Sequence, residues 1–193
     1  MKSIISQRIS SSIGVKQLIL DNQQLIAVIE EISKLCISTF NNNNKILLCG
    51  NGGSASDAQH LAAELTGRYY FDRAPLDAEA LHVNTSYLTA VANDYSFEEI
   101  YSRLIKAKGR SGDVLFAFST SGNSANIIKA ISTARALNMK IVGFTGKTGG
   151  KMVDLCDFMI NIPSEDTPRI QECHILVGHI ICEIIESNIF PKV

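Results

Sequence analysis

A turn rich in serine has the composition of a phosphate-binding site. Residues 119–124 read Ser-Thr-Ser-Gly-Asn-Ser, directly after the apolar segment Val114–Phe118 and before a segment with helical periodicity. The first N–H groups of a helix lack partners and carry about half a positive charge, so they attract anions. Hydroxyl groups add neutral donors, and Gly122 lets the backbone close around a ligand. A capped turn needs only one such side chain, so the composition predicts a phosphate site formed by Ser119, Thr120, Ser121 and Ser124.

A second group of residues has the types needed to move protons. His60 and Glu64 are four residues apart, so they share one face of a helix that begins just after a glycine-rich loop. Gln171 and His179 lie on a later helical segment, about 80° apart around a regular helix and ~12 Å apart along it. They can flank a common pocket, but binding one metal ion would require both side chains to reach it or the helix to deform. Structural roles are expected for the remaining histidines, His82 and His174.

The glycine-rich loop at residues 50–54 matches a nucleotide-binding motif only superficially. It contains G-x-G-x-x-A, but the next apolar segment ends in His-Val-Asn at 82–84, where a dinucleotide site requires an acidic residue. Residues 145–148 resemble the end of a P-loop, but Ile141 occupies the position of its first glycine. Both nucleotide interpretations are rejected, and the loop is expected to approach a small ligand through its backbone.

The elements that must position these residues alternate along the chain from Lys45 onward. Short apolar runs predict strands at 46–49, 78–83, 114–118, 141–144 and 158–162, and helical patterns cover 54–67, 85–92, 96–108, 123–137 and 165–189. Continuously apolar strands separated by helices are typical of a parallel sheet that is covered on both faces. The sequence therefore predicts an α/β fold with a doubly wound, five-stranded parallel sheet, whose ligands bind at the carboxyl ends of the strands.

Residues 1–42 precede the alternating pattern and have apolar positions at helical spacing. They predict an N-terminal helical arm of two helices, with a break at about residues 10–14. Together with the sheet, the arm predicts one domain over residues 1–193.

The composition excludes several classes of function. The chain is 46% hydrophobic and 19% charged, with a net charge of −1, which gives no reason to expect binding to nucleic acid or to a membrane surface. It lacks an apolar run of the ~18 residues that a spanning helix needs, and its N-terminus lacks the features of a signal peptide. The five cysteines are odd in number and scattered, so we expect reduced thiols and a cytoplasmic protein.

Five segments form a more specific pattern when they are taken in order. They are CGNGGSASDAQHLAAELTGRY, ANDYSFEEIYSR, GDVLFAFSTSGNSANIIKAI, GFTGKTGGKM and PRIQECHILVGHIICEII. Together they resemble the phosphoheptose isomerases of the sugar isomerase (SIS) domain superfamily, over nearly the whole chain. The resemblance implies a flavodoxin-like SIS-type sandwich, a homotetramer with active sites at subunit interfaces, and zinc, one per subunit, in some members.

The same resemblance implies an activity. It is the interconversion of D-sedoheptulose 7-phosphate and D-glycero-D-manno-heptose 7-phosphate, which feeds heptose synthesis for bacterial surface glycans such as lipopolysaccharide. Such an isomerisation moves a proton between adjacent carbons through an enediol, so it needs a base and a group that moves protons between oxygens. It needs no nucleotide cofactor, in agreement with the rejected nucleotide motifs.

Roles for individual residues also follow from the resemblance. Glu64 is implied as the base and His179 as its acid–base partner. The implied metal ligands are His60, Glu64, Gln171 and His179. The implied substrate contacts are Asn51, Gly52, Gly53, Glu64, Asn93, Asp94, Ser119, Thr120, Ser121, Ser124 and Gln171.

Two alternatives and one departure accompany this interpretation. The first alternative is a noncatalytic SIS relative that binds the bacterial replication initiator. Asn-Ile-Phe-Pro at 188–191 resembles the tail of that relative. The relative lacks the second histidine of the last helix, whereas this chain has His179 there. An isomerase of another phosphosugar would use the same mechanism. Pro168 stands where some family members carry an acidic residue, so substrate contacts are expected to differ there, and nearby Asp166 is out of register and receives no role.

Overall fold

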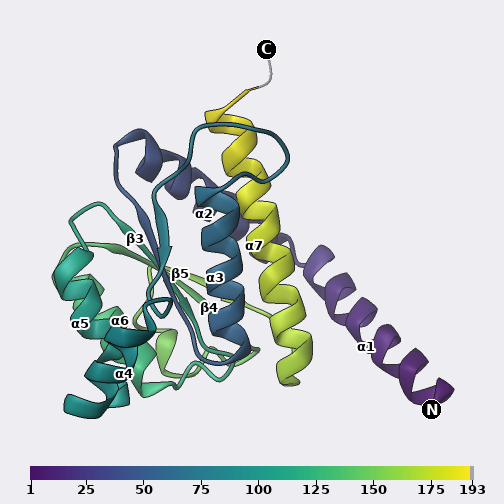
Figure 1. Ribbon diagram of the computed structural model, residues 1–193. Helices are drawn as coiled ribbons and strands as arrows, with labels where there is room; N and C mark the ends of the chain where they lie inside the picture. The colour runs from purple at the N-terminus through teal and green to yellow at the C-terminus, as the bar shows by residue number, and fades with distance from the viewer. Residues whose placement is uncertain (192–193) are drawn as a thin grey trace.

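The computed structural model describes residues 1–191 and contains one parallel sheet covered by helices on both faces (Figure 1). Its strands are β1 (Ile46–Cys49), β2 (Ala78–Ala80), β3 (Val114–Phe118), β4 (Lys140–Thr145) and β5 (Phe158–Asn161). They lie in the order β2-β1-β3-β4-β5, and every neighbouring pair is parallel. The predicted α/β class and five-stranded sheet are confirmed.

The helices follow the alternating pattern, with an arm at the N-terminus. They are α1 (Lys2–Leu20), α2 (Gln23–Asn41), α3 (Gly53–Thr66), α4 (Thr85–Asp94), α5 (Ile100–Lys108), α6 (Ala125–Ala136) and α7 (Thr167–Ile189), with two short 3₁₀ turns, η1 (Phe97–Glu99) and η2 (Gly150–Met152). Helix α1 projects from the body of the molecule, and α7 lies across the sheet beside α2 and α3 (Figure 1).

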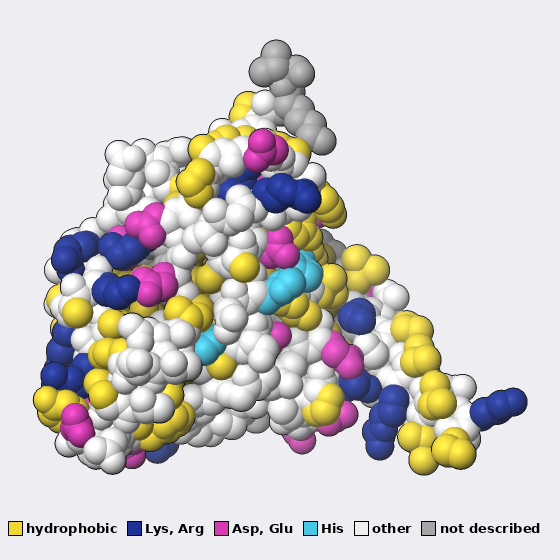
Figure 2. Space-filling view, in the orientation of Figure 1, with side chains coloured by type: hydrophobic (Ala, Val, Ile, Leu, Met, Phe, Trp, Pro, Cys, Tyr) yellow, Lys and Arg dark blue, Asp and Glu magenta, His cyan; other side chains and the backbone are white. Residues whose placement is uncertain are grey.

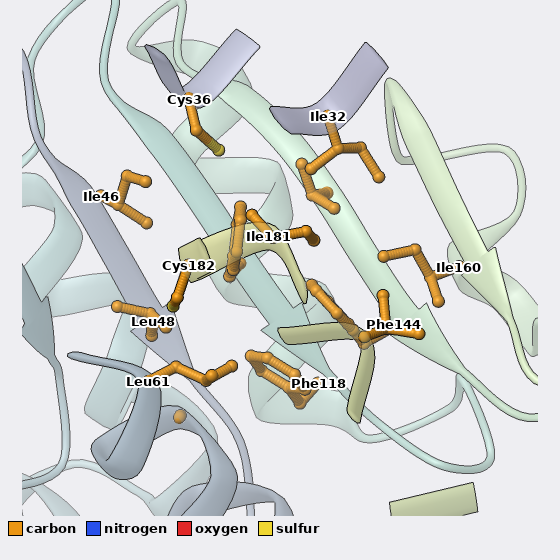
Figure 3. Close-up of a cluster of buried hydrophobic side chains, with 14 of the residues drawn as sticks. Ile32, Cys36, Ile46, Leu48, Leu61, Phe118, Phe144, Ile160, Ile181 and Cys182 are labelled. Carbon is orange, nitrogen blue, oxygen red and sulfur yellow. The ribbon is translucent and has the colours of Figure 1, made fainter. Parts of the chain in front are cut away.

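The strands are buried because each of their two faces packs against helices. In β1, Ile46 and Leu48 belong to the cluster formed with α2, α3 and α7, whereas Leu47 and Cys49 belong to the cluster formed with α4, α5 and α6. Figure 3 shows the first cluster, in which Leu61 of α3 packs among residues of α2, α7 and the sheet. Alternate side chains of a strand point to opposite faces, so the continuous apolar runs of the sequence follow from this double cover.

The predicted break within the N-terminal arm is wrong. Helix α1 continues through residues 10–14, and the chain turns instead at Asp21 and Asn22. A single glycine in a helix costs about 1 kcal/mol relative to alanine, which does not end it, so Gly14 is accommodated. Asn22 begins α2 because its side chain accepts the N–H of Leu25 at 3.1 Å.

Two other predicted elements differ in detail. The second strand spans only Ala78–Ala80 because the chain turns immediately afterwards, and the helix predicted at 96–108 begins with the 3₁₀ turn η1 before α5. None of the helices in residues 1–191 combines the length and the apolar character that a transmembrane span requires.

Candidate active site

The serine turn connects β3 to α6 at the carboxyl edge of the sheet. The hydroxyl oxygens of Ser119 and Ser124 lie 2.9 Å apart across the turn. Gly122 has a φ of +67°, and a Cβ at this position would collide with the carbonyl oxygen of Gly149, so both the backbone conformation and the space require glycine. In the described chain no side chain caps the N-terminus of α6, which leaves its N–H groups available to an anion.

A cavity of about 280 Å³ opens beside this turn. Its walls come from the turn, from the loop after β4 and from the start of α7, and they include Thr120, Ser121, Lys147, Thr148 and Thr167. Hydroxyl groups, the ammonium group of Lys147 and the carboxylate of Glu165 therefore border the space next to the predicted phosphate site. The hydroxyl and ammonium donors suit a polyhydroxylated, phosphorylated ligand.

The glycine-rich loop after β1 is tied by a pair of asparagines to the first turn of α6, which follows the serine turn. Asn51 and Asn126 exchange two hydrogen bonds through their side-chain amides, at 2.9 and 2.8 Å. The hydroxyl of Tyr101 also donates to the carbonyl of Gly50. Asn126 is 4% exposed and was missed by the sequence analysis; the available signal was an asparagine in the first turn of α6, inside an apolar helical face.

Three titratable side chains from two helices meet at one point. The Nε2 atoms of His60 and His179 lie 3.0 Å apart, and His60 Nε2 lies 3.1 Å from Glu64 Oε1. The ligand atoms of all three residues lie within 4.8 Å of one another. Figure 2 shows histidine side chains gathered at the surface over α3 and α7. We call these three residues the His60–Glu64–His179 cluster.

Close packing of α3 against α7 creates this cluster. Gly178 lies directly against Leu61, and a Cβ on Gly178 would collide with the Leu61 side chain. Each of these residues is the chain neighbour of a cluster histidine, so the missing Cβ lets the two helices approach where His60 and His179 must meet. The tight approach therefore explains how residues 119 positions apart come into contact.

The environment of His179 favours its neutral form. Burial lowers the pKa of His179, and the neighbouring His60 lowers it further, whereas Glu64 acts in the opposite direction. A neutral imidazole can accept a proton or bind a metal ion through its free nitrogen.

The donor atoms of the cluster suit a zinc ion. Two imidazole nitrogens and one carboxylate oxygen form the ligand set of several catalytic zinc sites, in which a further position stays open to water or substrate. The facing Nε2 atoms of His60 and His179 fit this chemistry, since each presents a lone pair or a proton to the same small space. Gln171, the fourth predicted ligand, lies eight residues earlier on α7, with its amide beside Gly53; a Cβ there would be 2.6 Å from Gln171 Nε2.

The remaining predicted substrate residues lie on a different element. Asn93 donates to Asp94 at 2.9 Å near the end of α4. Helix α4 packs on the face of the sheet opposite to α7, so the structure does not bring this pair to the His60–Glu64–His179 cluster within one chain.

Tyr69 is a further neighbour of the cluster that the sequence analysis missed. Its ring centroid lies 5.8 Å from that of His179, with the two planes inclined at 45°. It follows the end of α3, and nothing in its local sequence marks it as part of a site, because its neighbour on α7 is more than a hundred residues away.

The fold and the serine turn together define a class of protein. It is a doubly wound α/β protein that presents an anion-binding type of turn at the carboxyl edge of its sheet and holds an acid–base cluster between α3 and α7.

Comparisons with known proteins identify the family. Residues 15–146 match the SIS domain family model. The chain is 51% identical to the phosphoheptose isomerase of Aneurinibacillus thermoaerophilus over 98% of this chain and 96% of that protein, and 49% identical to that of Sulfurimonas denitrificans over 98% and 97%. The chain therefore belongs to the phosphoheptose isomerases of the SIS domain family.

Solved structures agree with this assignment. The phosphoheptose isomerase of Neisseria gonorrhoeae is 42% identical and superposes with a TM-score of 0.91 over 96% of this chain and 98% of that one. The enzyme of Francisella tularensis is 34% identical, with a TM-score of 0.92 over 96% and 97%. These full-length relatives are isomerases, which favours the enzyme over the noncatalytic alternative.

Proposed function

We propose that this chain interconverts D-sedoheptulose 7-phosphate and D-glycero-D-manno-heptose 7-phosphate, and so supplies heptose for bacterial surface glycans. The observation that carries the proposal is the meeting of Glu64, His60 and His179 between α3 and α7, in a chain that also carries an anion-binding type of turn after β3. The full-length identity to phosphoheptose isomerases supports the choice of a seven-carbon substrate.

The serine turn would hold the phosphate. The hydroxyl groups of Ser119, Thr120, Ser121 and Ser124 and the N–H groups at the start of α6 donate to the phosphate oxygens. The sugar then extends toward α3 and α7, past Gly52, Gly53 and Gln171. An anchored phosphate restricts the motion of the reacting carbons, which favours the reaction by reducing the entropy lost in the transition state.

Glu64 and His179 would carry out the proton transfers. Starting from the ketose, the Glu64 carboxylate removes a proton from C1, while O2 receives a proton from His179 to give the enediol. Removal of the proton from O1 and return of a proton to C2 then yield the aldose. The neutral form of His179 that its surroundings favour must first take up a proton, which it can receive from O1 of the preceding turnover.

Zinc is the metal that we propose for the cluster. His60, Glu64 and His179 would hold it, with Gln171 as a fourth candidate. When bound, zinc would stabilise negative charge on a substrate oxygen as a Lewis acid. The cluster geometry supports zinc because both histidine Nε2 atoms and the carboxylate point to one space.

A homotetramer in the cytoplasm completes the proposal. Helix α1 exposes large apolar side chains that a second copy would bury: Ile4, Ile5, Ile9 and Ile13. Asn93 and Asp94 lie on the far face of the sheet from α7, so a site that uses them together with His179 would take them from a neighbouring copy. The five cysteines are unpaired thiols, as is usual in a reducing compartment.

The decisive experiment is an isomerisation assay on the purified protein. We expect the wild type to convert sedoheptulose 7-phosphate, and Glu64→Gln to lose turnover by about 10²–10⁴-fold while keeping the fold, because the base is lost without a change of size. Treatment with a chelator should reduce turnover, and added zinc should restore it. Full turnover by Glu64→Gln would rule out the proposed base, and a wild type inactive on every seven-carbon ketose phosphate would rule out the proposed function.

A further inference from the structure

A buried ion pair joins the two helices that carry Glu64 and His179. Arg73 follows α3, Glu186 lies near the end of α7, and their side chains are 2% and 1% exposed. Arg73 Nε donates to Glu186 Oε1 at 3.1 Å. Breaking such a pair by removing one partner leaves an uncompensated buried charge, so the two residues depend on each other.

Glu186 also binds the backbone of the segment that follows α3. Its Oε1 accepts the N–H of Tyr69 at 2.8 Å, and its Oε2 accepts the N–H of Tyr70 at 2.7 Å. Burial opposes the ionisation of Glu186, but the N–H groups of Tyr70 and Tyr69 together with the Arg73 guanidinium lower its pKa, so the carboxylate is charged. A charged acceptor makes these hydrogen bonds stronger than neutral ones.

Arg73 attaches the same network to the end of α3. Its Nη2 donates to the carbonyl of Glu64 at 2.8 Å, and its Nη1 donates to the carbonyls of Leu65 and Gly67 at 2.7 and 3.2 Å. The last carbonyls of a helix have no partner within the helix, and a cation there also interacts favourably with the helix dipole. The guanidinium therefore fixes the helical turn that carries Glu64.

The Tyr69 ring connects this network to His179. Its backbone is held by Glu186, and its ring packs against the imidazole of His179 and against Tyr70, with centroid distances of 5.8 and 4.5 Å. Glu186 and His179 are seven residues apart on α7, which places them on one face of the helix. Burial, together with a side-chain hydrogen bond to Tyr70, raises the pKa of Tyr69 to about 12, so the ring beside the imidazole stays uncharged at neutral pH.

We propose that Glu186 and Tyr69 are positioning residues, and that the buried Glu186–Arg73 pair holds the Tyr69 ring against His179 and so fixes the imidazole toward Glu64. The proposal rests on the proton-transfer roles proposed above for Glu64 and His179. An imidazole turns about two side-chain bonds, and a misplacement of about 1 Å can cost on the order of 100-fold in rate. A packed aromatic ring limits those rotations.

The chain offers a matched control in another part of the fold. Asp113 is 1% exposed, pairs with Lys45 Nζ at 2.9 Å, and accepts the N–H groups of Lys45 and Arg110 at 3.1 and 2.8 Å. It is therefore a buried carboxylate with the same kinds of partners as Glu186, but it precedes β3 and lies away from the cluster. If kcat falls only because a buried ion pair is broken, substituting Asp113 should lower kcat as much as substituting Glu186.

The first experiment compares Glu186→Gln with Asp113→Asn, at a temperature where both variants are folded. We expect both variants to melt at lower temperature than the wild type. Glu186→Gln should lower kcat by at least about tenfold while KM for sedoheptulose 7-phosphate stays within about twofold, and Asp113→Asn should leave kcat unchanged. A Glu186→Gln enzyme with wild-type kcat would overturn the proposal.

The second experiment tests Tyr69 without disturbing the ion pair, and it decides the case if Glu186→Gln fails to fold. Tyr69→Phe keeps the ring and should keep kcat within about twofold, whereas Tyr69→Ala should lower kcat about as much as Glu186→Gln. If Glu186 acts through Tyr69, the double variant should lose little more than either single variant. Wild-type kcat in Tyr69→Ala, or losses that multiply in the double variant, would contradict the proposal.

A third measurement separates this proposal from the proposed function. The imidazole resonance of His179 in NMR spectra, assigned by its loss in His179→Gln, reports the surroundings of the ring without any turnover. It should shift in Glu186→Gln and Tyr69→Ala and stay in place in Asp113→Asn. An unshifted resonance in both site variants would overturn the positioning role, even if the wild type proved to be an active isomerase.

Discussion

The serine turn and the His60–Glu64–His179 cluster are built in opposite ways. The turn is made from six consecutive residues between one strand and one helix, and its main internal contact, between Ser119 and Ser124, spans five residues. The cluster joins residues 119 positions apart and depends on the packing of α3 against α7. A site that needs only backbone N–H groups can be local, whereas a site that needs several side chains around one point requires distant elements.

The serine turn and the cluster also differ in the task that their side chains can perform. The turn offers neutral hydroxyls and helix N–H groups, which bind an anion without titrating near neutral pH. The cluster consists of groups that gain and lose protons. Changes in the turn should therefore affect binding, and changes in the cluster should affect the reaction.

The largest effect is expected from His179→Gln, which would break the cluster and leave the turn intact. Kcat should fall by about 10²–10⁴-fold because an acid–base group is lost, while phosphosugar binding measured by calorimetry should persist. His82→Gln, which changes a histidine bonded to Gln59 outside the cluster, should retain kcat. If His179→Gln abolished binding as well, the division of tasks between turn and cluster would be wrong.

A smaller effect, on stability rather than on turnover, is expected from His174, which lies on the same helix as His179 but faces the core. It is fully buried, its Nε2 bonds the carbonyl of Thr145 at 3.1 Å, and burial lowers its pKa to about 4 despite that bond. Above pH 6.5 it is neutral in both folded and unfolded chains. As the pH falls from 6.5 to 4, the unfolded chain takes up a proton that the folded chain does not, so the free energy of unfolding should drop by about 3 kcal/mol.

Denaturant unfolding at a series of pH values tests this contrast between the two histidines. Other groups also titrate over this range, so the wild type is compared with His174→Asn. The drop in the free energy of unfolding that comes from His174 should be absent in this variant. Equal pH dependence in the two proteins would show that the burial of His174 does not control its protonation.

The smallest effect is expected from Ser124→Ala in the turn. Losing one neutral hydroxyl should weaken phosphosugar binding by about 2–10-fold, equivalent to about 0.5–1.5 kcal/mol, with kcat nearly unchanged. Ser132→Ala, on the exposed side of the same helix, is the control, since its hydroxyl bonds the carbonyl of Ile128 within that helix. A Ser124→Ala variant with normal KM and reduced kcat would reverse the assignment of tasks.

The parts of the fold that the sequence predicted well are those with local causes. The continuous apolar runs at Ile46–Cys49 and Val114–Phe118 predict buried parallel strands, and both are observed. The break in the arm was placed at the wrong residue because a glycine inside a helix is a weak signal. The cap formed by Asn22 is a stronger one, and it is where the chain actually turns.

Parts of the site were predictable for the same reason. His60 and Glu64 are one turn apart on α3, so their contact follows from helix geometry. The contact of His179 with that pair was not readable from spacing, nor was the pairing of Asn51 with Asn126 across 75 positions. The sequence assigned both Asn51 and His179 to the site by resemblance to a family; it gave only a weak signal for Asn126, a polar residue on an apolar helical face, and none for Tyr69.

By itself, the sequence determined the α/β alternation and the phosphate-type turn, because hydrophobic periodicity and helix N-termini act over a few neighbouring residues. Only the tertiary structure decided which side chains meet around His179. That meeting depends on the close approach of Gly178 to Leu61 and on the Glu186–Arg73 pair. Packing and buried charge act between residues that are near in space, whatever their separation along the chain.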